Sequence, residues 1–216
     1  MIFEKKKIKT YKDLKLLATP EENFTNLVYI LNLLKNLEHF VFFGTLLGLV
    51  RDNSLIENDD DIDIYVNINE RAKLIKILQD NSILVDFNLS VNKHDSFLQV
   101  IRKINNKNAI IDFYFFEDSL DKNYLIEKWN WCALPDDSSK HLRIPKIFTH
   151  PIQTLEVKSY KINFPSQPEY LCEFLYGKNW RKKLSKENDY INKVIDGKPV
   201  VFSFRTNIFG KKKIIL

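Results

Sequence analysis

The residues with the clearest chemistry are four carboxylates in positions 59–63, within the sequence NDDDIDI. On an extended strand side chains alternate between two faces, so Asp61 and Asp63 point one way while Ile62 and Ile64 point into a core. Two carboxylates on one face, about 7 Å apart along the strand, repel each other unless a cation lies between them. Mg²⁺ takes one or two protein carboxylates together with substrate phosphates. The pattern therefore predicts that Asp61 and Asp63 are catalytic metal ligands for Mg²⁺, with Mn²⁺ as the alternative ion.

A third acid, Asp112, lies in the apolar strand pattern IIDFYFF at positions 110–116. Its apolar neighbours alternate with it and would face the core, so the carboxylate projects from the other face. We expect Asp112 to lie on a neighbouring strand and to complete a triad of acids. It would be a ligand of a second ion or the base that takes the proton of an acceptor hydroxyl. Asp59 and Asp60, at the start of the first strand, are secondary candidates.

A solvated turn and a calcium loop are the alternatives to a metal-binding strand for the acidic run. An isolated acidic triplet is usually a solvated turn, but Asp63 and Asp112 lie inside strongly apolar strand patterns. A calcium loop of the EF-hand type needs Gly at its sixth position for a sharp bend, and Ile64 occupies that position. The alternation of the sequence IDIYV also favours a strand over a loop.

Upstream of the acids, the apolar run 40–50 predicts a short strand over 40–43, ended by Gly44, and a short helix over about 45–51. Gly44 permits close approach of a ligand to the backbone. Thr45 can cap the helix or bind a phosphate oxygen at its positive end.

The sequence GTLLGLVRDNSLIENDDDIDI, positions 44–64, resembles the signature of the LicD family: GTLLGxxR, a spacer and DDDID. That family includes the bacterial phosphocholine transferases, fukutin and fukutin-related protein. The sequence PSQPEYLCEFLYGKNWR, positions 165–181, looks like the family's C-terminal Y-L-x(n)-YG-x-W element. The resemblance implies a nucleotidyltransferase-like fold of the DNA polymerase beta type. It also implies Mg²⁺ at the DxD pair and transfer of a phospho-alcohol from a CDP-linked donor, such as CDP-choline or CDP-ribitol, to a glycan hydroxyl.

Carried over by position, the resemblance makes Gly44 and Thr45 phosphate contacts and Arg51 a basic residue near the donor. Lys178 and Arg181, which flank Trp180, are further candidates for binding the phosphates. The chain departs from the family in having Glu57-Asn58 where an aromatic residue usually precedes the acids. It is also shorter than many relatives and lacks the cysteine cluster of some animal members.

The remaining elements predict an α+β fold, with a mixed sheet flanked by helices and a small C-terminal helical element. Two capping boxes, at Thr19–Glu22 and Ser166–Glu169, predict the starts of two helices. The first helix runs to about Leu37 and the second stops at Gly177. Other predicted elements are strands 61–66, 83–89, 97–104 and 109–116, a helix over 70–79 and a strand pair within 144–164. We expect one domain over residues 1–216, with a core at about 20–118 and a C-terminal element at about 144–185.

Composition limits the class of protein. Aromatic residues make up 13% of 216, which disfavours a disordered chain. The two cysteines, Cys132 and Cys172, are far apart, so reduced thiols are expected and a structural zinc site is not. No apolar segment reaches the roughly 20 residues of a membrane span, and no signal peptide is visible, which predicts a soluble cytoplasmic protein. The net charge of +5 favours anionic partners, but the lysines are scattered, so nucleic acid is not expected.

The sequence thus predicts a Mg²⁺-dependent phosphotransferase whose partners are a CDP-linked donor and a glycan acceptor. The alternative enzyme is a nucleotidyltransferase that attacks an NTP and releases pyrophosphate, because the same acids serve both reactions. A third function, from a different class, is a non-catalytic metal- or nucleotide-binding module. The intact acids at positions 61, 63 and 112 argue against that module.

Overall fold

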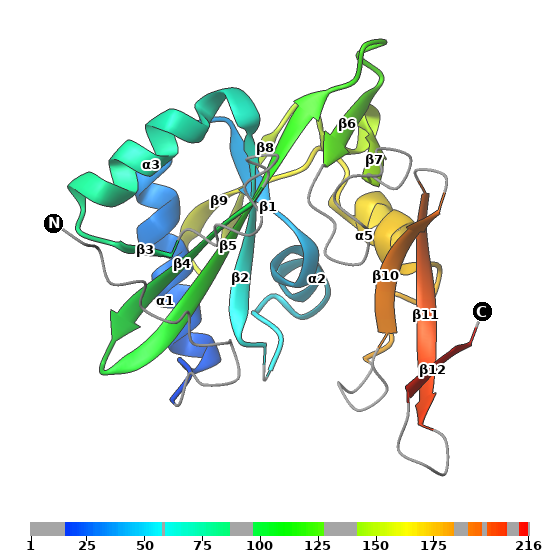
Figure 1. Ribbon diagram of the computed structural model, residues 1–216, viewed down its shortest axis with the longest axis horizontal. Helices are drawn as coiled ribbons and strands as arrows, with labels where there is room; N and C mark the ends of the chain where they lie inside the picture. Colours follow the sequence, from blue (N-terminus) through cyan, green and yellow to red (C-terminus); the bar gives the residue numbers. More distant parts are fainter. Residues whose placement is uncertain are drawn as a thin grey trace, which may run out of the picture.

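A mixed sheet dominates the computed structural model, which describes residues 16–57, 59–86, 97–127, 142–183, 190–195, 198–206 and 212–215. The strand order is β1-β2-β5-β4-β3, and β6 and β7 extend the sheet from β5 (Figure 1). The strands are β1 His39–Val41, β2 Asp61–Asn67, β3 Leu84–Asp86, β4 Phe97–Ile104, β5 Lys107–Asp118, β6 Tyr124–Glu127 and β7 Leu142–Pro145. Strands β2 and β5 are parallel, and the other pairs are antiparallel. This confirms the predicted α+β fold with a mixed sheet.

Helices cover both faces of this sheet. They are α1 Pro20–Leu33, α2 Phe43–Asp52, α3 Arg71–Asp80, preceded by the 3-10 turn Ile68–Glu70, α4 Lys146–Thr149 and α5 Pro168–Tyr176. Figure 1 shows α1 and α3 on one side of β2 and α2 on the other. Because β5 lies in the middle of the sheet and is covered on both faces, its residues from Asn108 to Phe116 are all buried.

The start of α1 follows the predicted capping box. The Thr19 hydroxyl accepts a hydrogen bond from the Glu22 backbone N–H, and the Glu22 carboxylate accepts one from the Thr19 N–H at 2.8 Å. The helix ends at Leu33, before the predicted Leu37, because Leu34 leaves the helical conformation at φ −89° and ψ 1°. Leu34 and Leu37 are nevertheless buried, so the apolar periodicity marks the core beyond the last helical turn.

The second predicted capping box is wrong. Gln167 is the N-cap of α5 and makes no capping bond with its side chain, while the Ser166 hydroxyl donates to the Ile147 carbonyl oxygen at 2.8 Å. Ser166 stands one residue too early to cap and instead ties the start of α5 to α4. The predicted end of the helix is confirmed, since α5 stops before Gly177, which has φ +81°.

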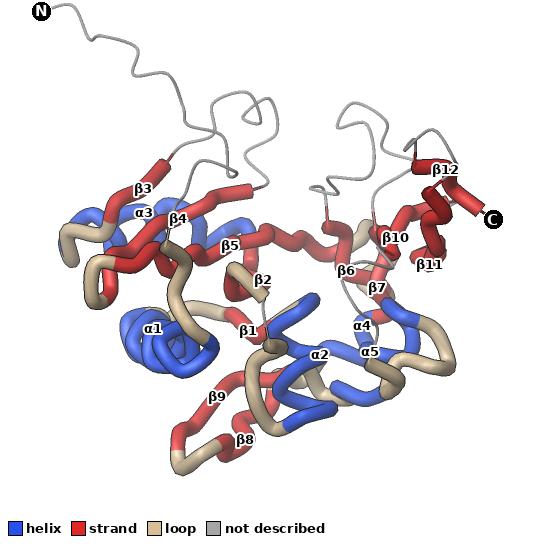
Figure 2. Tube along the Cα trace, turned by 90° about the horizontal axis from the view of Figure 1, so that it is seen from below, coloured by secondary structure: helices blue, strands red, loops and turns tan. Residues whose placement is uncertain are grey.

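The C-terminal third contains more strand than predicted. The hairpin β8 Gln153–Val157 and β9 Tyr160–Phe164 confirms a strand pair within 144–164. A separate antiparallel sheet of β10 Tyr190–Ile195, β11 Lys198–Thr206 and β12 Lys212–Ile215 lies beside α5 (Figure 1), and was not predicted. In Figure 2, α2 lies next to α5, against which it packs.

Three further sequence expectations concern the cysteines, the predicted strand 83–89 and membrane-spanning segments. Cys172 is a free, buried thiol, and Cys132 lies outside the described residues. Residues 87–89 of the predicted strand 83–89 also lie outside them. Among the described segments, no helix combines the length and the apolar character needed to cross a membrane.

Gly48 fixes how α2 packs against the loop that follows it. A Cβ at this position would lie 2.6 Å from the Ser54 carbonyl oxygen and 2.9 Å from the Ile56 backbone nitrogen. We expect Gly48→Ala to destabilise the fold by about 1–3 kcal/mol, because two backbone segments must move apart. The midpoint of thermal unfolding should fall by several degrees. An unchanged midpoint would mean that the loop does not rest on α2 in solution.

Candidate active site

The structure brings Asp61, Asp63 and Asp112 together. Strands β2 and β5 pair in parallel with Asp63 opposite Asp112. One carboxylate oxygen from each of the three acids lies within 4.8 Å of the other two. Asp63 and Asp112 are 5% and 6% exposed, so their charges sit largely out of water.

Burial and neighbouring charges disfavour the ionised states of Asp63 and Asp112. Burial raises the pKa of Asp63 well above its usual range, and the charges of Asp61, Asp59 and Asp112 raise it further. Burial also raises the pKa of Asp112 to about 7, although a hydrogen bond from Gln99 acts in the opposite direction. A cluster of carboxylates, two of them buried, is a donor set that suits a hard divalent cation, which would favour their ionised forms and offset the repulsion between them. The residues present therefore fit a metal ion.

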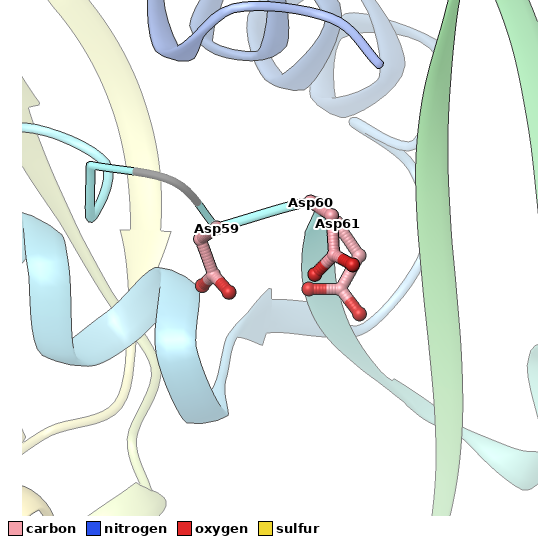
Figure 3. A group of neighbouring side chains, drawn as sticks. All are labelled: Asp59, Asp60 and Asp61. Carbon is pink, nitrogen blue, oxygen red and sulfur yellow. The ribbon is translucent and has the colours of Figure 1, made fainter. Parts of the chain in front are cut away.

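Asp59, Asp60 and Asp61 form a second group whose carboxylate oxygens lie within 4.8 Å of one another. Figure 3 shows the Asp59 side chain beside the first turn of α2, with the Asp60 and Asp61 side chains next to each other at the start of β2. Asp61 belongs to both groups. The two secondary candidates of the sequence are thus neighbours of the predicted triad.

The N-terminal turn of α2 faces the acids, but it differs from the predicted helix start. The helix begins at Phe43, two residues before the predicted Thr45, and its N-cap, Phe42, makes no side-chain capping bond. A Cβ on Gly44 would lie 2.6 Å from an oxygen of Asp59 and 3.3 Å from one of Asp63, so a side chain at this position would displace the Asp59 carboxylate from its place beside the helix.

Thr45 is not a helix cap. Its hydroxyl accepts a hydrogen bond from the Asp63 backbone N–H at 2.8 Å, and its own N–H points to an Asp63 carboxylate oxygen at 3.4 Å. These contacts fix α2 against β2 at the level of Asp63. The prediction that Thr45 caps the helix is therefore wrong, because the helix starts earlier than the glycine suggested.

Comparison with known proteins agrees with this geometry. The sequence profile of the family described as LicD/FKTN/FKRP, nucleotidyltransferase domain, matches residues 36–167. The chain belongs to this family. The matched residues contain Gly44, Thr45, Arg51 and the three acids of the triad, whereas α5 begins just beyond them. A comparison with curated protein sequences found no match.

Among solved structures, the lincosamide antibiotic adenylyltransferase LnuA with lincomycin bound is similar to this chain, with a TM-score of 0.51. The two chains are 14% identical, and the similarity covers 80% of this chain and 92% of that one. Such low identity shows the fold alone. This LicD-family chain therefore has the predicted nucleotidyltransferase-like fold.

The three cationic residues predicted to bind the donor lie at the end of α2 or just after α5 in this LicD-family chain. Arg51 stands in the last turn of α2, about 10 Å along the axis from Gly44, and its guanidinium bonds Asp52 at 2.8 Å. The Arg181 guanidinium bonds Glu169 at 2.7 Å and lies 4.2 Å from the centroid of the Trp180 ring. Lys178 is exposed. Both arginines thus form their ion pairs with acids outside the triad.

The buried thiol of Cys172 on α5 lies near both Arg51 and Arg181. Burial raises its pKa to about 12, and the positive charges of Arg181 and Arg51 both act to lower that pKa. The two guanidinium groups therefore lie near the buried face of α5. Trp180 is buried, as expected for a packing residue.

Sequence reasoning missed Gln99, which touches the triad. Its side-chain amide donates a hydrogen bond to Asp112 at 2.8 Å. A signal was present, because the alternation of FLQVIRKI places Gln99 on the same face as the apolar Phe97 and Ile101. A polar residue at such a position needs a partner, and strand pairing supplies Asp112.

Proposed function

We propose that this chain is a Mg²⁺-dependent phosphotransferase. It would move a phospho-alcohol, such as phosphocholine, ribitol phosphate or glycerol phosphate, from a CDP-linked donor to a hydroxyl of a glycan. The observation that carries the proposal is the cluster of Asp61, Asp63 and Asp112 beside the first turn of α2. Membership of the LicD family supports the choice of donor.

In this proposal the three acids hold Mg²⁺, or Mn²⁺ in its place. The bound ion would supply charge neutralisation for the donor diphosphate and the leaving CMP. Gly44 and Thr45, in the first turn of α2, would contact the donor phosphates, because the positive end of a helix favours anions. Thr45 also holds the backbone of Asp63 in place.

Asp112 has a second proposed role. A carboxyl whose pKa lies near 7 can accept the proton of an acceptor hydroxyl at neutral pH, so it would act as ligand or as general base. Arg51, Lys178 and Arg181 remain proposed donor-binding residues. Their location near α5 suits the end of the donor that lies away from the acids. We also propose that residues 1–216 act as one domain.

The alternative function is a nucleotidyltransferase that uses an NTP and releases pyrophosphate. One observation favours it: the structure of LnuA, a lincosamide antibiotic adenylyltransferase, shares this fold. The two reactions differ in the phosphorus that is attacked, and the triad of acids suits both.

A panel of donors with Mg²⁺ distinguishes these functions. We expect CDP-choline, CDP-ribitol or CDP-glycerol to raise the midpoint of thermal unfolding by about 5–10 °C at roughly 100 times its dissociation constant. The same donor should release CMP when a glycan acceptor is supplied. A shift with NTPs only, accompanied by pyrophosphate release, would replace the proposal with the alternative. A shift with either class of nucleotide but without release of CMP or pyrophosphate would point to a non-catalytic module.

A further inference from the structure

Gln99 is the polar partner of the triad that neither the sequence motif nor the family resemblance assigns. It lies on β4 directly opposite Asp112 on β5, in an antiparallel register. Its Nε2 donates to Asp112 Oδ1 at 2.8 Å, a good hydrogen-bond distance. Gln99 is half-buried and Asp112 is buried, so this bond lies at the inner edge of the site.

The hydrogen bond acts on the orientation of Asp112. It limits the rotation of the carboxylate about its last side-chain torsion, which is otherwise broad. A cation binds a carboxylate oxygen only when that oxygen points toward it, so a fixed rotation prepares Asp112 for a metal ion.

Packing holds Gln99 in the geometry that makes this bond. On one side, Phe97 and Tyr114 occupy the next positions of the same two strands on the same face, and their ring centroids are 5.2 Å apart. Both rings are buried. On the other side, Ile101 pairs with the buried Ile110. The Gln99–Asp112 pair is therefore flanked on the same face by an aromatic pair and an aliphatic pair.

The bond between the two side chains is not needed to join the two strands. Strands β4 and β5 pair through their backbones over the whole of Phe97–Ile104, so the register is already fixed by the ladder. An apolar residue at position 99 would continue the apolar face formed by its neighbours. The polar side chain is therefore better explained by its action on Asp112 than by strand pairing.

We propose that Gln99 is a positioning residue of the metal site, which orients the Asp112 carboxylate for a divalent cation. Of the proposed function, the inference requires only the metal site, and it does not depend on the identity of the donor or the acceptor. Groups that orient metal ligands typically contribute 10–100-fold to metal affinity. Gln99→Leu, which keeps the size but removes the donor, should weaken binding by about that factor.

The test is a titration of the metal-free full chain with Mn²⁺, in which the free ion is followed by electron paramagnetic resonance. Four proteins form a double-mutant cycle: wild type, Gln99→Leu, Asp112→Asn and the double variant. We expect Gln99→Leu to weaken Mn²⁺ binding about 10–100-fold in the wild-type background. In the Asp112→Asn background it should change the affinity by less than about twofold, because the coupled partner is gone.

Two controls keep a folding defect apart from a loss of positioning. A partly unfolded sample lowers the number of ions bound per chain, whereas a loss of positioning lowers the affinity. Gln99→Met provides a second apolar variant if Gln99→Leu fails to fold. Gln99→Asn keeps an amide on a shorter arm, and it should bind Mn²⁺ no better than Gln99→Leu if reach to Asp112 matters.

An unchanged affinity in Gln99→Leu, or an equal loss in both backgrounds, would overturn the positioning role and leave the proposed metal site intact. If the wild-type chain binds no Mn²⁺, the proposed metal site itself is wrong and the positioning role falls with it.

Discussion

The double variant Asp61→Asn with Asp63→Asn should lose Mg²⁺-dependent turnover of its donor by about 1,000-fold or more, because metal-borne charge stabilisation is worth several kcal/mol in the transition state. Binding of Mn²⁺ should be lost in the same protein. Without metal, however, the variant should be at least as stable as the wild type. Burial and neighbouring acids already disfavour the charge of Asp63, so an amide of the same shape removes a repulsion.

This combination of lost activity and retained stability separates a functional site from a structural one. The matched control is Asp80→Asn with Asp118→Asn, which removes the same number of charges from exposed acids paired with Lys76 and Lys146. We expect the control to keep its turnover and its metal affinity. Full Mg²⁺-dependent turnover in the Asp61, Asp63 variant would show that the proposed metal site is wrong.

The positions of the three acids could be predicted from sequence because strand alternation is a local property. The pattern DIDIYV requires Asp61 and Asp63 to share a face. The pattern IIDFYFF likewise places Asp112 on the face opposite to its apolar neighbours. The order of the strands is not local. The structure joins β2 to β5 in parallel, although β3 and β4 lie between them in the chain, and this pairing places Asp63 opposite Asp112. Gln99 could not be linked to Asp112 before the register was known.

The errors in the predicted start of α2 and in the predicted role of Thr45 also have physical reasons. Gly44 suggested the end of a strand, yet α2 begins at Phe43, which has a positive φ of 37° that is rare for a bulky residue. The earlier start moves Thr45 into the helix, where it bonds to Asp63. Arg51 belongs to the same motif as the acids, but it lies seven residues along a helix from Gly44, and helical rise carries it toward α5.

The strands at the C-terminal end could have been predicted from their composition. The sequence KPVVFSFRT at 198–206 is rich in β-branched and aromatic residues, as β11 requires. The motif that ends at Arg181 predicts only a helical element in this part of the chain. The resemblance was most reliable for α2 and β2, which lie within the matched residues 36–167.

The metal-free chain should lose stability as the pH rises from about 4 to 7, relative to Asp112→Asn. The unfolded Asp112 loses its proton near its ordinary pKa of 3.8, whereas the folded one keeps it until about 7. The folded state therefore binds the extra proton within this window, and the stabilisation that is present below pH 4 disappears as the pH rises through 7. A shift of this size corresponds to about 4 kcal/mol.

Denaturant unfolding of both proteins with a chelator present, at intervals from pH 4 to pH 8, measures this difference. The comparison cancels groups such as Glu22, whose lowered pKa of about 2 gives a stabilisation that is lost as the pH falls. Mg²⁺ competes with protons for the same carboxylates, so it should stabilise the wild type most above pH 7 and stabilise Asp112→Asn less. Parallel curves for the two proteins, with and without Mg²⁺, would show that Asp112 neither holds the proton nor contributes to the ion's site. A loss of stability with rising pH that Mg²⁺ reduces in the wild type, and much less in Asp112→Asn, would tie the buried carboxylate, its proton and the cation to one site.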